Sequence, residues 1–199
     1  MKTKILSLTL LAVVLAGFTK NTYAAASAGS NYTVLNDIKA INKIEVRGNV
    51  ELFISDNAAE KVTVYNKYYA ESALVQSKNG VLRISSYTPE KLVVWVSSES
   101  LRSVSAFDNA EIKSFGKVSK IEFNIDLHDN ASAKLDFDAY SANVTLRDNA
   151  TIELSGTVEE FGVNRTLGSM VINKGLSVAH NNENKIVGQA GKVALAGLE

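Results

Sequence analysis

Three copies of the tripeptide Asp-Asn-Ala place acidic and amide side chains, which could bind a ligand, at regular spacing along the chain. From the first Asp to the second is 21 residues, and from the second to the third is 19 residues. If the copies stack, their carboxylates form one edge that could coordinate Ca²⁺ through several oxygen ligands. Two carboxylates on neighbouring copies would also meet the separation that glycosidases use. The candidate ligand-binding edge comprises Asp108, Asn109, Asp129, Asn130, Asp148 and Asn149.

Neither of these chemistries has a second signal in the sequence. The glycine-rich nonapeptide repeat of calcium-binding β-helices is absent, and the two histidines, His128 and His180, lie in no metal-ligand or nucleophile motif. The sequence therefore predicts no catalytic residue, no cofactor and no resident metal, while Ca²⁺ at the Asp edge stays open. The tripeptide also has a structural interpretation, because Asn and Asp accept the left-handed backbone of a sharp corner.

A second candidate site is aromatic. In the stretch Leu92–Val96, alternation places Trp95 on the face opposite to Leu92, Val94 and Val96. Trp95 and Tyr87, with Tyr65, Tyr68 or Tyr69, could form a platform for sugar rings or for a partner protein. The alternative is that Trp95 is buried under residues 66–77 or at a terminal cap.

The elements that position these residues are β-strands. Period-2 alternation of apolar residues runs through the chain beyond its first 24 residues. Around each Asp-Asn-Ala copy, the positions four and two before the Asp and two after it are apolar, which predicts one inward face. Residues 66–77 are the one place where a short helix or a looser loop fits. The inward columns are Val104, Ile125 and Val144; Ala106, Leu127 and Leu146; and Ala110, Ala131 and Ala150.

A repeat of 19–21 residues fits one rung of a coiled β-solenoid and is too short for a helix pair or a propeller blade. We therefore expect an all-β, right-handed parallel β-helix of about seven rungs. The same frame extends upstream to Asp56-Asn57-Ala58 and downstream to Leu167-Gly168-Ser169. In such a coil, corner side chains of successive rungs lie about 4.8 Å apart and can form a hydrogen-bonded ladder.

Residues 1–24 have the composition of a secretory signal peptide: a basic start, an apolar run from Ile5 to Phe18, and small residues at 24–26. Cleavage after Ala24 or after Ala26 satisfies the small-residue rule, and we favour Ala24. A transmembrane anchor is disfavoured because the apolar run is shorter than the roughly 20 residues that span a bilayer and Lys20 follows it. We expect residues 25–37 to form an N-terminal segment that could cap the coil, and residues 38–197 to form the solenoid domain.

Composition excludes several classes of protein. The chain contains no Cys, which excludes a lipid-modified cysteine and any disulfide, so burial and hydrogen bonds must stabilise the fold. Removal of residues 1–24 takes away three Lys and no acidic residue, which leaves 18 basic and 21 acidic residues and a net charge of −3. No basic run interleaved with aromatics occurs, so nucleic acid is excluded as a partner.

Several segments resemble the head GIN domain of auto-transporter adhesins. They are the stretch Ile41–Leu52, the stretch Asn79–Ile84, and the repeats that begin at Leu101. The resemblance covers about residues 38–197 and implies an exported bacterial β-solenoid at the cell envelope, of unassigned function. The usual corner of the family is Gly-Ser-Gly, whereas this chain has Asp-Asn-Ala in four rungs and keeps Gly168-Ser169 in a later one.

Together, these features suggest a non-enzymatic, adhesin-type binding module in the periplasm, at the cell surface or outside the cell. We expect its lateral face or its Asp-Asn edge to engage a polysaccharide or a cell-envelope protein. The alternatives are a carbohydrate-active hydrolase or lyase on the same scaffold, and a purely structural envelope protein. Exposed strand edges at the ends of a solenoid also leave an end-to-end dimer open.

Overall fold

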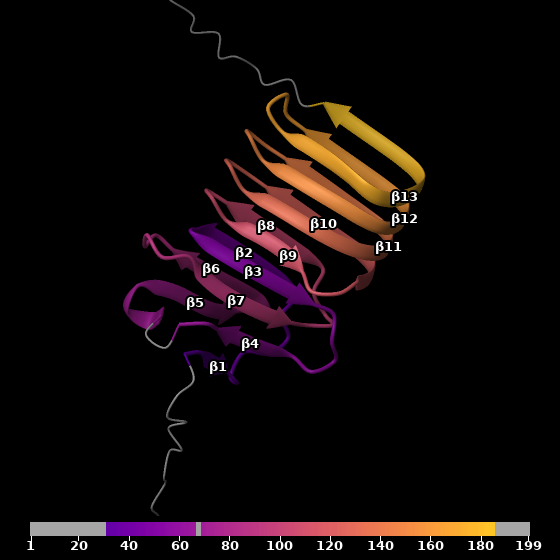
Figure 1. The fold of residues 1–199 in the computed structure, drawn as a ribbon. Coiled ribbons are helices and arrows are strands. Elements are labelled where there is room, and N and C mark those ends of the chain that lie inside the picture. Colours follow the sequence, from indigo (N-terminus) through magenta and orange to yellow (C-terminus); the bar gives the residue numbers. More distant parts are fainter. Residues whose placement is uncertain (1–30, 67–68, 186–199) are drawn as a thin grey trace, which may run out of the picture. The chain divides into compact units, whose positions relative to one another are not determined.

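The computed structural model describes residues 31–66 and 69–185, which form one unit built from strands (Figure 1). The all-β prediction is confirmed, since these two ranges contain no α-helix and only one 3-10 turn, η1 (Tyr69–Glu71). The predicted signal peptide at 1–24 and residues 186–197 of the predicted domain lie outside the described residues. The strands are β1 (Thr33–Leu35), β2 (Lys43–Gly48), β3 (Val50–Ser55), β4 (Lys61–Val64), β5 (Ala73–Lys78), β6 (Val81–Ser86), β7 (Leu92–Ser97), β8 (Ser103–Phe107), β9 (Glu111–Ser114), β10 (Val118–Leu127), β11 (Ser132–Leu146), β12 (Thr151–Arg165) and β13 (Met170–Lys185).

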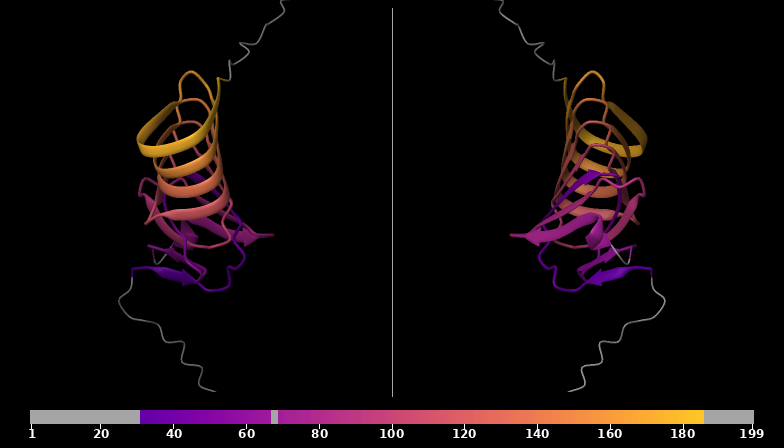
Figure 2. Two further views of the ribbon diagram at one scale, coloured as in Figure 1. Left: turned by 90° about the vertical axis from the view of Figure 1, so that its right-hand side faces the viewer. Right: turned by 90° about the vertical axis from the view of Figure 1, so that its left-hand side faces the viewer.

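The strands form one curled sheet with two walls. The first wall contains β6, β2, β8 and the second parts of β10 to β13, and the second wall contains β7, β3, β9 and the first parts of β11 to β13. The long strands β11, β12 and β13 bend from the second wall into the first, and successive turns of the chain stack as loops (Figure 2). In the N-terminal half the strands are short, and each strand belongs to one wall only.

From β8 onward, the chain stacks rung upon rung in parallel register. Ile125 of β10 pairs with Val104 of β8 and with Val144 of β11, and Val144 pairs in turn with Val163 of β12. Equivalent residues of consecutive rungs are 21 or 19 residues apart at the Asp corner. This part of the molecule agrees with the spacing found in the sequence.

The N-terminal half departs from a purely parallel coil. Strand β2 lies between β6 and β8, and β3 lies between β7 and β9, so the first rung of the chain is sandwiched between the second and the third. Strands β4 and β5 add antiparallel pairs to β7 and β6, and β1 pairs antiparallel with β4. The sheet is therefore mixed, and a parallel β-helix over the whole domain is not confirmed. Residues 66–77, predicted as a short helix or a loop, contain in their described part η1 and all of β5 except Lys78, so much of this segment is a strand.

Apolar side chains from both walls fill the space between them. The predicted inward columns are all buried, and the largest fully buried side chains include Phe123, Phe137 and Ile125. Burial of a Leu, Ile or Phe side chain stabilises a fold by about 1.5–3 kcal/mol, so this core supplies the main driving force. Strand register matters because a shift by one residue would turn each of these side chains to solvent.

The predicted corner of the first rung differs from the structure. The first rung turns at Gly48-Asn49, where Gly48 has φ +79° and an added Cβ would lie 2.1 Å from the Ser86 carbonyl oxygen. Asp56-Asn57-Ala58, which the sequence frame aligned with the corner, lies on the side opposite the corner, which we call the return side. It links β3 to β4, and β4 pairs with β7 of the same second wall. The Asp-Asn-Ala corner therefore occurs in three rungs and not in four.

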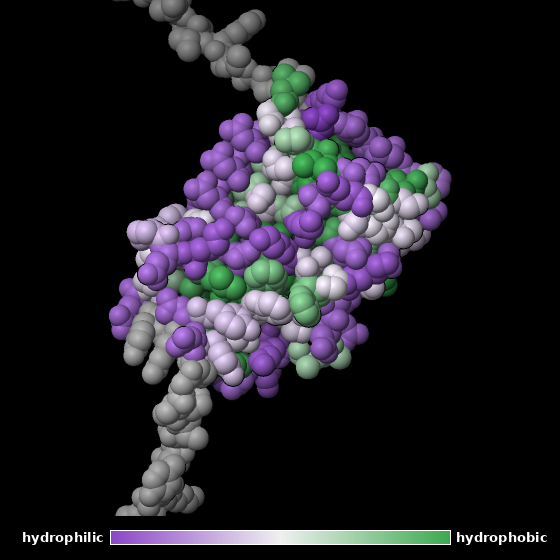
Figure 3. Space-filling view, in the orientation of Figure 1, coloured by the Kyte–Doolittle hydropathy of each residue, from purple (hydrophilic) through white to green (hydrophobic). Residues whose placement is uncertain are grey.

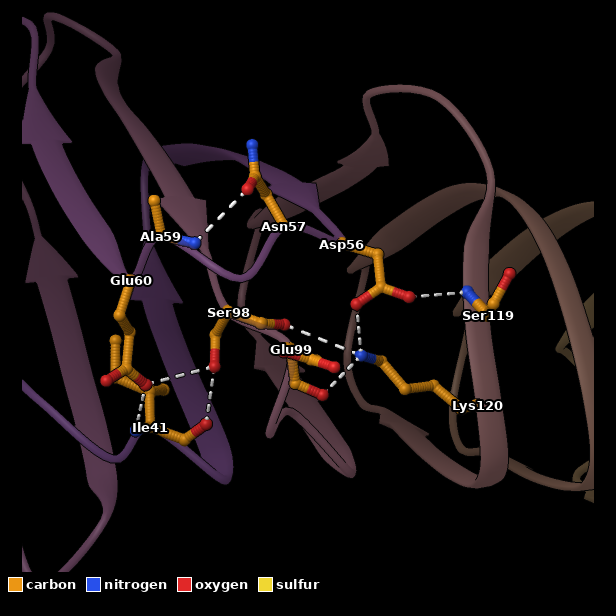
Figure 4. Close-up of polar contacts among 9 residues, drawn as sticks. All are labelled: Ile41, Asp56, Asn57, Ala59, Glu60, Ser98, Glu99, Ser119 and Lys120. Carbon is orange, nitrogen blue, oxygen red and sulfur yellow. Dashed lines mark hydrogen bonds and ion pairs between the residues drawn. The ribbon is translucent and has the colours of Figure 1, made fainter.

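On the return side, a half-buried ion pair joins loops of three rungs (Figure 4). The Lys120 ammonium, whose side chain is 7% exposed, donates to Asp56 Oδ1 at 2.5 Å and to the Glu99 carbonyl at 2.7 Å. Asp56 Oδ2 accepts the Ser119 N–H at 2.9 Å. Removal of one partner of such a buried pair typically costs 3–5 kcal/mol, because it leaves the other charge uncompensated. The contact holds together the loops after β3 and β7 and the start of β10, where the order of rungs in space differs from their order in the sequence.

Glu60 makes a second polar anchor on the return side (Figure 4). Its carboxylate accepts the N–H groups of Ala40 at 2.6 Å and Ile41 at 2.7 Å, and the Ser98 hydroxyl at 3.1 Å. Burial alone would raise the pKa of Glu60, but the hydrogen bonds from Ile41, Ala40 and Ser98 outweigh it and hold the pKa below its ordinary value.

Strand β13 ends the described stack and is polar at positions where earlier strands are apolar. Asn173, Asn181 and Glu183 pair with the buried Leu154, Phe161 and Val163 of β12. These residues line a hollow at this end of the stack, together with Val171, Leu176 and Val178. The core thus changes from fully apolar to mixed within one rung.

The corner geometry predicts an unequal response to substitution of Asp129. Asp129→Ala should lower the free energy of unfolding by about 1–2 kcal/mol. Asp129 has a φ of +57°, at which Ala is strained, and Ala has no carboxylate to accept the N–H of Asp108. Asp129→Gly should cost less, because Gly accepts a positive φ. Urea unfolding measures both, and an Ala variant as stable as the wild type would refute this role of the corner.

The pKa of Glu60 predicts the pH dependence of stability. Because its folded pKa lies below the unfolded value, the contribution of the carboxylate is present above the unfolded pKa and is lost as pH falls through the folded pKa. Glu60→Gln should therefore be less stable than wild type at pH 7, and the difference should shrink in acid. Urea unfolding from pH 7 to about pH 3 measures this. A constant difference at all pH values would contradict it.

Candidate functional site

The three Asp-Asn-Ala copies lie one above another at the corner between the two walls. Asp108, Asp129 and Asp148 have φ values of +61°, +57° and +56°, in the left-handed region. In each copy the Ala N–H donates to the carbonyl of the residue before the Asp, at 2.9–3.2 Å, and closes a four-residue turn. The buried Ala side chain then enters the core beyond the corner. The corner thus has a structural use for each residue of the tripeptide.

Each corner carboxylate accepts a backbone hydrogen bond from the neighbouring rung. Asp129 Oδ2 accepts the Asp108 N–H at 3.0 Å, and Asp148 Oδ2 accepts the Asp129 N–H at 3.3 Å. Asp108 Oδ2 accepts the N–H of Gly48, which occupies the same position in the first rung, at 3.1 Å. These bonds satisfy N–H groups that a left-handed residue turns out of the sheet ladder.

The corner amides form a parallel ladder beside the carboxylates. Asn130 Nδ2 donates to Asn109 Oδ1 at 3.3 Å, and Asn149 Nδ2 donates to Asn130 Oδ1 at 3.4 Å. Among residues 31–66 and 69–185, no group of three or more His, Cys, Asp or Glu side chains could share a metal ion. The geometry of the edge is therefore that of a turn whose polar groups mostly bind one another.

Tyr87 belongs to this edge. Its exposed ring lies beside Gly48, and its hydroxyl donates to Asp108 Oδ2 at 3.3 Å. The structure thus brings together Tyr87 and the Asp edge, two candidates that the sequence treated separately. It does not bring Tyr87 into ring contact with Trp95.

The histidines lie on the outside of the first wall. His128 stacks on Phe107 with ring centroids 4.6 Å apart, and its Nε2 lies 3.0 Å from Asp126 Oδ1. Arg47 lies over the other face of Phe107, at 3.8 Å from the centroid. His180 is exposed near Glu159. His180 lines a shallow hollow on this wall together with Glu160 and Ser141.

Trp95 lies in a row of aromatic rings on the outside of the second wall, which we call the aromatic cluster. Its ring stacks on Phe53 with centroids 4.9 Å apart, meets Phe115 at 4.9 Å and Tyr65 at 6.2 Å, and Tyr65 meets Tyr32 at 5.8 Å. Trp95 and Phe53 are half-buried, whereas Phe115 is 60% exposed, Tyr65 49% and Tyr32 45%. The exposed rings, and not Trp95 itself, offer the contact surface.

Strand register explains the aromatic cluster. Trp95 of β7 is directly opposite Phe53 of β3, and both point outward because their neighbours Val94 and Leu52 fill the core. Phe115 follows β9 immediately before Gly116, whose φ of +77° turns the chain. Aromatic pairs of this kind contribute about 0.5–1.5 kcal/mol beyond their buried area. Such a group of exposed rings is a candidate contact surface.

Ion pairs border the aromatic cluster. Lys113 pairs with Glu51, and with Glu111 at 3.3 Å, and Lys91 pairs with Glu111 at 2.7 Å. Hydrogen bonding to Glu51 raises the pKa of Lys113 against the opposing effect of burial, and hydrogen bonding to Lys91 lowers the pKa of Glu111. Both shifts favour the charged forms of Lys113 and Glu111.

A shallow hollow of about 370 Å³ adjoins Phe53 on the same wall. Its lining combines one aromatic ring with charged and hydroxyl side chains. Figure 3 shows apolar patches in green among hydrophilic residues in purple on the face that it presents. The lining residues are Phe53, Lys113, Ser114, Gly116, Lys134, Leu135, Asp136, Glu153 and Ser155.

The sequence analysis did not single out Phe53, Phe115 or Tyr32. Alternation in β3 already indicates that Phe53 points away from the core, since Leu52 and Ile54 are inward. Its position beside Trp95 follows only from the pairing of β3 with β7, which are separated in sequence by β4, β5 and β6.

This all-β scaffold carries an exposed aromatic cluster and, beside it, a hollow lined by charged and hydroxyl side chains. The family model "Putative auto-transporter adhesin, head GIN domain" matches residues 40–193, and the chain belongs to this family. No functionally curated protein shows significant sequence similarity to it.

Solved structures with the same fold carry related names. A protein from Parabacteroides distasonis named as a putative lipid binding protein has a TM-score of 0.62 at 12% identity, with 79% of each chain covered. A putative adhesin from Parabacteroides merdae has a TM-score of 0.56 at 17% identity, covering 79% of this chain and 78% of that chain. A putative adhesin from P. distasonis has the same TM-score and identity, with 79% of each chain covered. These likenesses establish the fold. Within the described residues, no helix is long and apolar enough to cross a membrane.

The hydrogen bonds of the Asp corner predict the response to calcium. Ca²⁺ at about 1 mM, a concentration that saturates typical extracellular sites, should leave the melting temperature unchanged. One oxygen of each corner carboxylate already accepts backbone N–H groups, so the ligand set is incomplete. Differential scanning calorimetry with and without EDTA measures this. A calcium-dependent rise that disappears in Asp148→Asn would show that the edge binds the ion.

Proposed function

We propose that this protein is an exported, non-enzymatic binding module that holds a polysaccharide against the aromatic cluster on the outside of its second wall. The observation that carries the proposal is the exposure of Phe115, Tyr65 and Tyr32 around the half-buried Trp95 and Phe53. Aromatic faces bind the apolar faces of sugar rings, and the neighbouring hydroxyl and charged groups can bind sugar hydroxyls. The adhesin name of the family supports a binding role.

We also propose the finer architecture. Residues 101–185 form a right-handed parallel β-helix, a signal peptide occupies residues 1–24, and the domain spans 38–197. Register offsets of 19–21 residues between paired residues of consecutive strands support the coil. Export to the periplasm, the cell surface or the medium accords with the family description. The Asp-Asn edge with Tyr87 is kept as a secondary contact surface for the same ligand.

A glycan panel tests the function directly. Wild-type protein should bind at least one insoluble or immobilised polysaccharide, and the double variant Tyr65→Ala with Phe115→Ala should bind at least tenfold more weakly, which corresponds to about 1.4 kcal/mol. Because the chain has a single Trp, ligand binding should also change the emission of Trp95.

Tyr140→Ala is the matched control, since it removes an exposed aromatic ring that belongs to neither the aromatic cluster nor the Asp-Asn edge, whereas Tyr87→Ala tests that edge. Circular dichroism confirms that the variants fold. Absence of binding to every polysaccharide, together with capture of an envelope protein that depends on Tyr65 and Phe115, would replace the polysaccharide by a protein partner. Equal loss of binding in Tyr87→Ala would move the site to the Asp-Asn edge.

A further inference from the structure

One row of outward side chains continues from the aromatic cluster into the hollow. In the strand register, Trp95 lies opposite Phe53, and Phe53 lies opposite Lys113. Lys113 in turn lies opposite Lys134, and Lys134 lies opposite Glu153. Each step crosses to the next strand, a distance of about 4.8 Å. The row therefore runs along the axis of the stack, perpendicular to the strands. A ligand on it would meet a similar position once per strand.

The charges along this row cancel. Lys113 is paired with Glu51 and Glu111, and Lys134 is paired with Glu153 at 2.8 Å. Hydrogen bonding to Lys134 lowers the pKa of Glu153, which favours its charged form. Neither an anion nor a cation would gain from the row without breaking an existing pair. Paired charges of this kind suit hydroxyl groups, which can donate to one partner and accept from the other.

Asp136 is the exception within the hollow. Its outward position follows from the buried Leu135 and Phe137 on either side of it in β11. Its N–H donates to the Ser114 hydroxyl at 2.8 Å, but no hydrogen bond or ion pair joins its carboxylate to another described residue. The two carboxylate oxygens can therefore accept two hydroxyl groups, and the hydroxyls of Ser114 and Ser155 line the same hollow.

From this arrangement, and resting on the proposed function, we infer that the ligand is a neutral, unbranched polysaccharide that lies along the row from Trp95 to Glu153. One sugar unit stacks against the exposed rings of the aromatic cluster. A unit further along the chain enters the hollow beyond Phe53, where Asp136 accepts two of its hydroxyl groups. Because the unit length of an extended sugar chain is similar to the spacing of strands, successive units stay in step with successive rungs.

Three properties follow. Binding should strengthen with the length of the oligosaccharide until the chain reaches from the aromatic cluster to the hollow. It should change little with ionic strength, since no net charge attracts the ligand. It should also discriminate against carboxylated chains, because an added carboxylate would approach Asp136.

Affinity gel electrophoresis tests the inference with defined probes. Gels contain either the neutral polysaccharides glucan, xylan and mannan or the carboxylated polygalacturonate and alginate, at low and at high salt. We expect retardation of wild type in at least one neutral gel, to within twofold the same at both salt concentrations. Asp136→Ala should weaken it about tenfold, the equivalent of about 1.4 kcal/mol. Glu122→Gln, an exposed acid on the first wall, is the matched control and should behave as wild type.

The outcomes separate the inference from the proposed function. Absence of retardation in both sets of gels would overturn both. Retardation only by carboxylated chains, or retardation abolished by salt, would overturn the neutral ligand and leave the aromatic site standing, provided that the Tyr65 and Phe115 variant loses it. Retardation by a neutral chain that Asp136→Ala does not weaken would overturn the role of the hollow. Asp136→Asn, which keeps one acceptor oxygen, should lose less than Asp136→Ala.

Discussion

In-register stacking of apolar side chains is the constraint on which the rest of this protein depends. A rung contributes to the core only if its inward residues lie directly against those of its neighbours, and a slip by one residue reverses every side chain. The corner enforces this alignment, since the chain must turn at the same height in each rung. A left-handed residue, either Gly48 or one of three Asp residues, makes the turn, and its hydrogen bond to the next rung fixes the height.

This use of the corner gives its repeated acids a structural role. The carboxylates accept hydrogen bonds from backbone N–H groups, and each amide nitrogen donates to the amide oxygen of the neighbouring rung. The polar groups of the edge therefore support the fold. The outward side chains of the second wall do not make the turns of the chain. Side chains there point away from the core and are free to differ between rungs, which is where the aromatic cluster and the balanced ion pairs occur. Function in a repeat scaffold resides in these variable outward positions.

The sequence predicted the strands, the inward columns and the corner because each depends on local alternation or on backbone preference. It could not predict that β2 and β3 lie between later rungs, since that order depends on contacts between residues 38 and 60 positions apart. The same limit applied to the site. Trp95 was recognisable, but Phe53 and Phe115 join it only through the pairing of β3 with β7 and the turn at Gly116. Asp56 was misassigned because its tripeptide matches the corner while its strand belongs to the other wall.

The mixed composition of β13 has a consequence for how the molecule meets copies of itself. A second stack placed on this end would have to remove Asn181 and Glu183 from water, and Glu183 would keep only its pair with Arg165 at 2.6 Å. The register shift between Leu154 and Gly156 further distorts the edge that a new strand would need. Polar residues at these positions thus disfavour direct stacking of a second copy on the edge of β13.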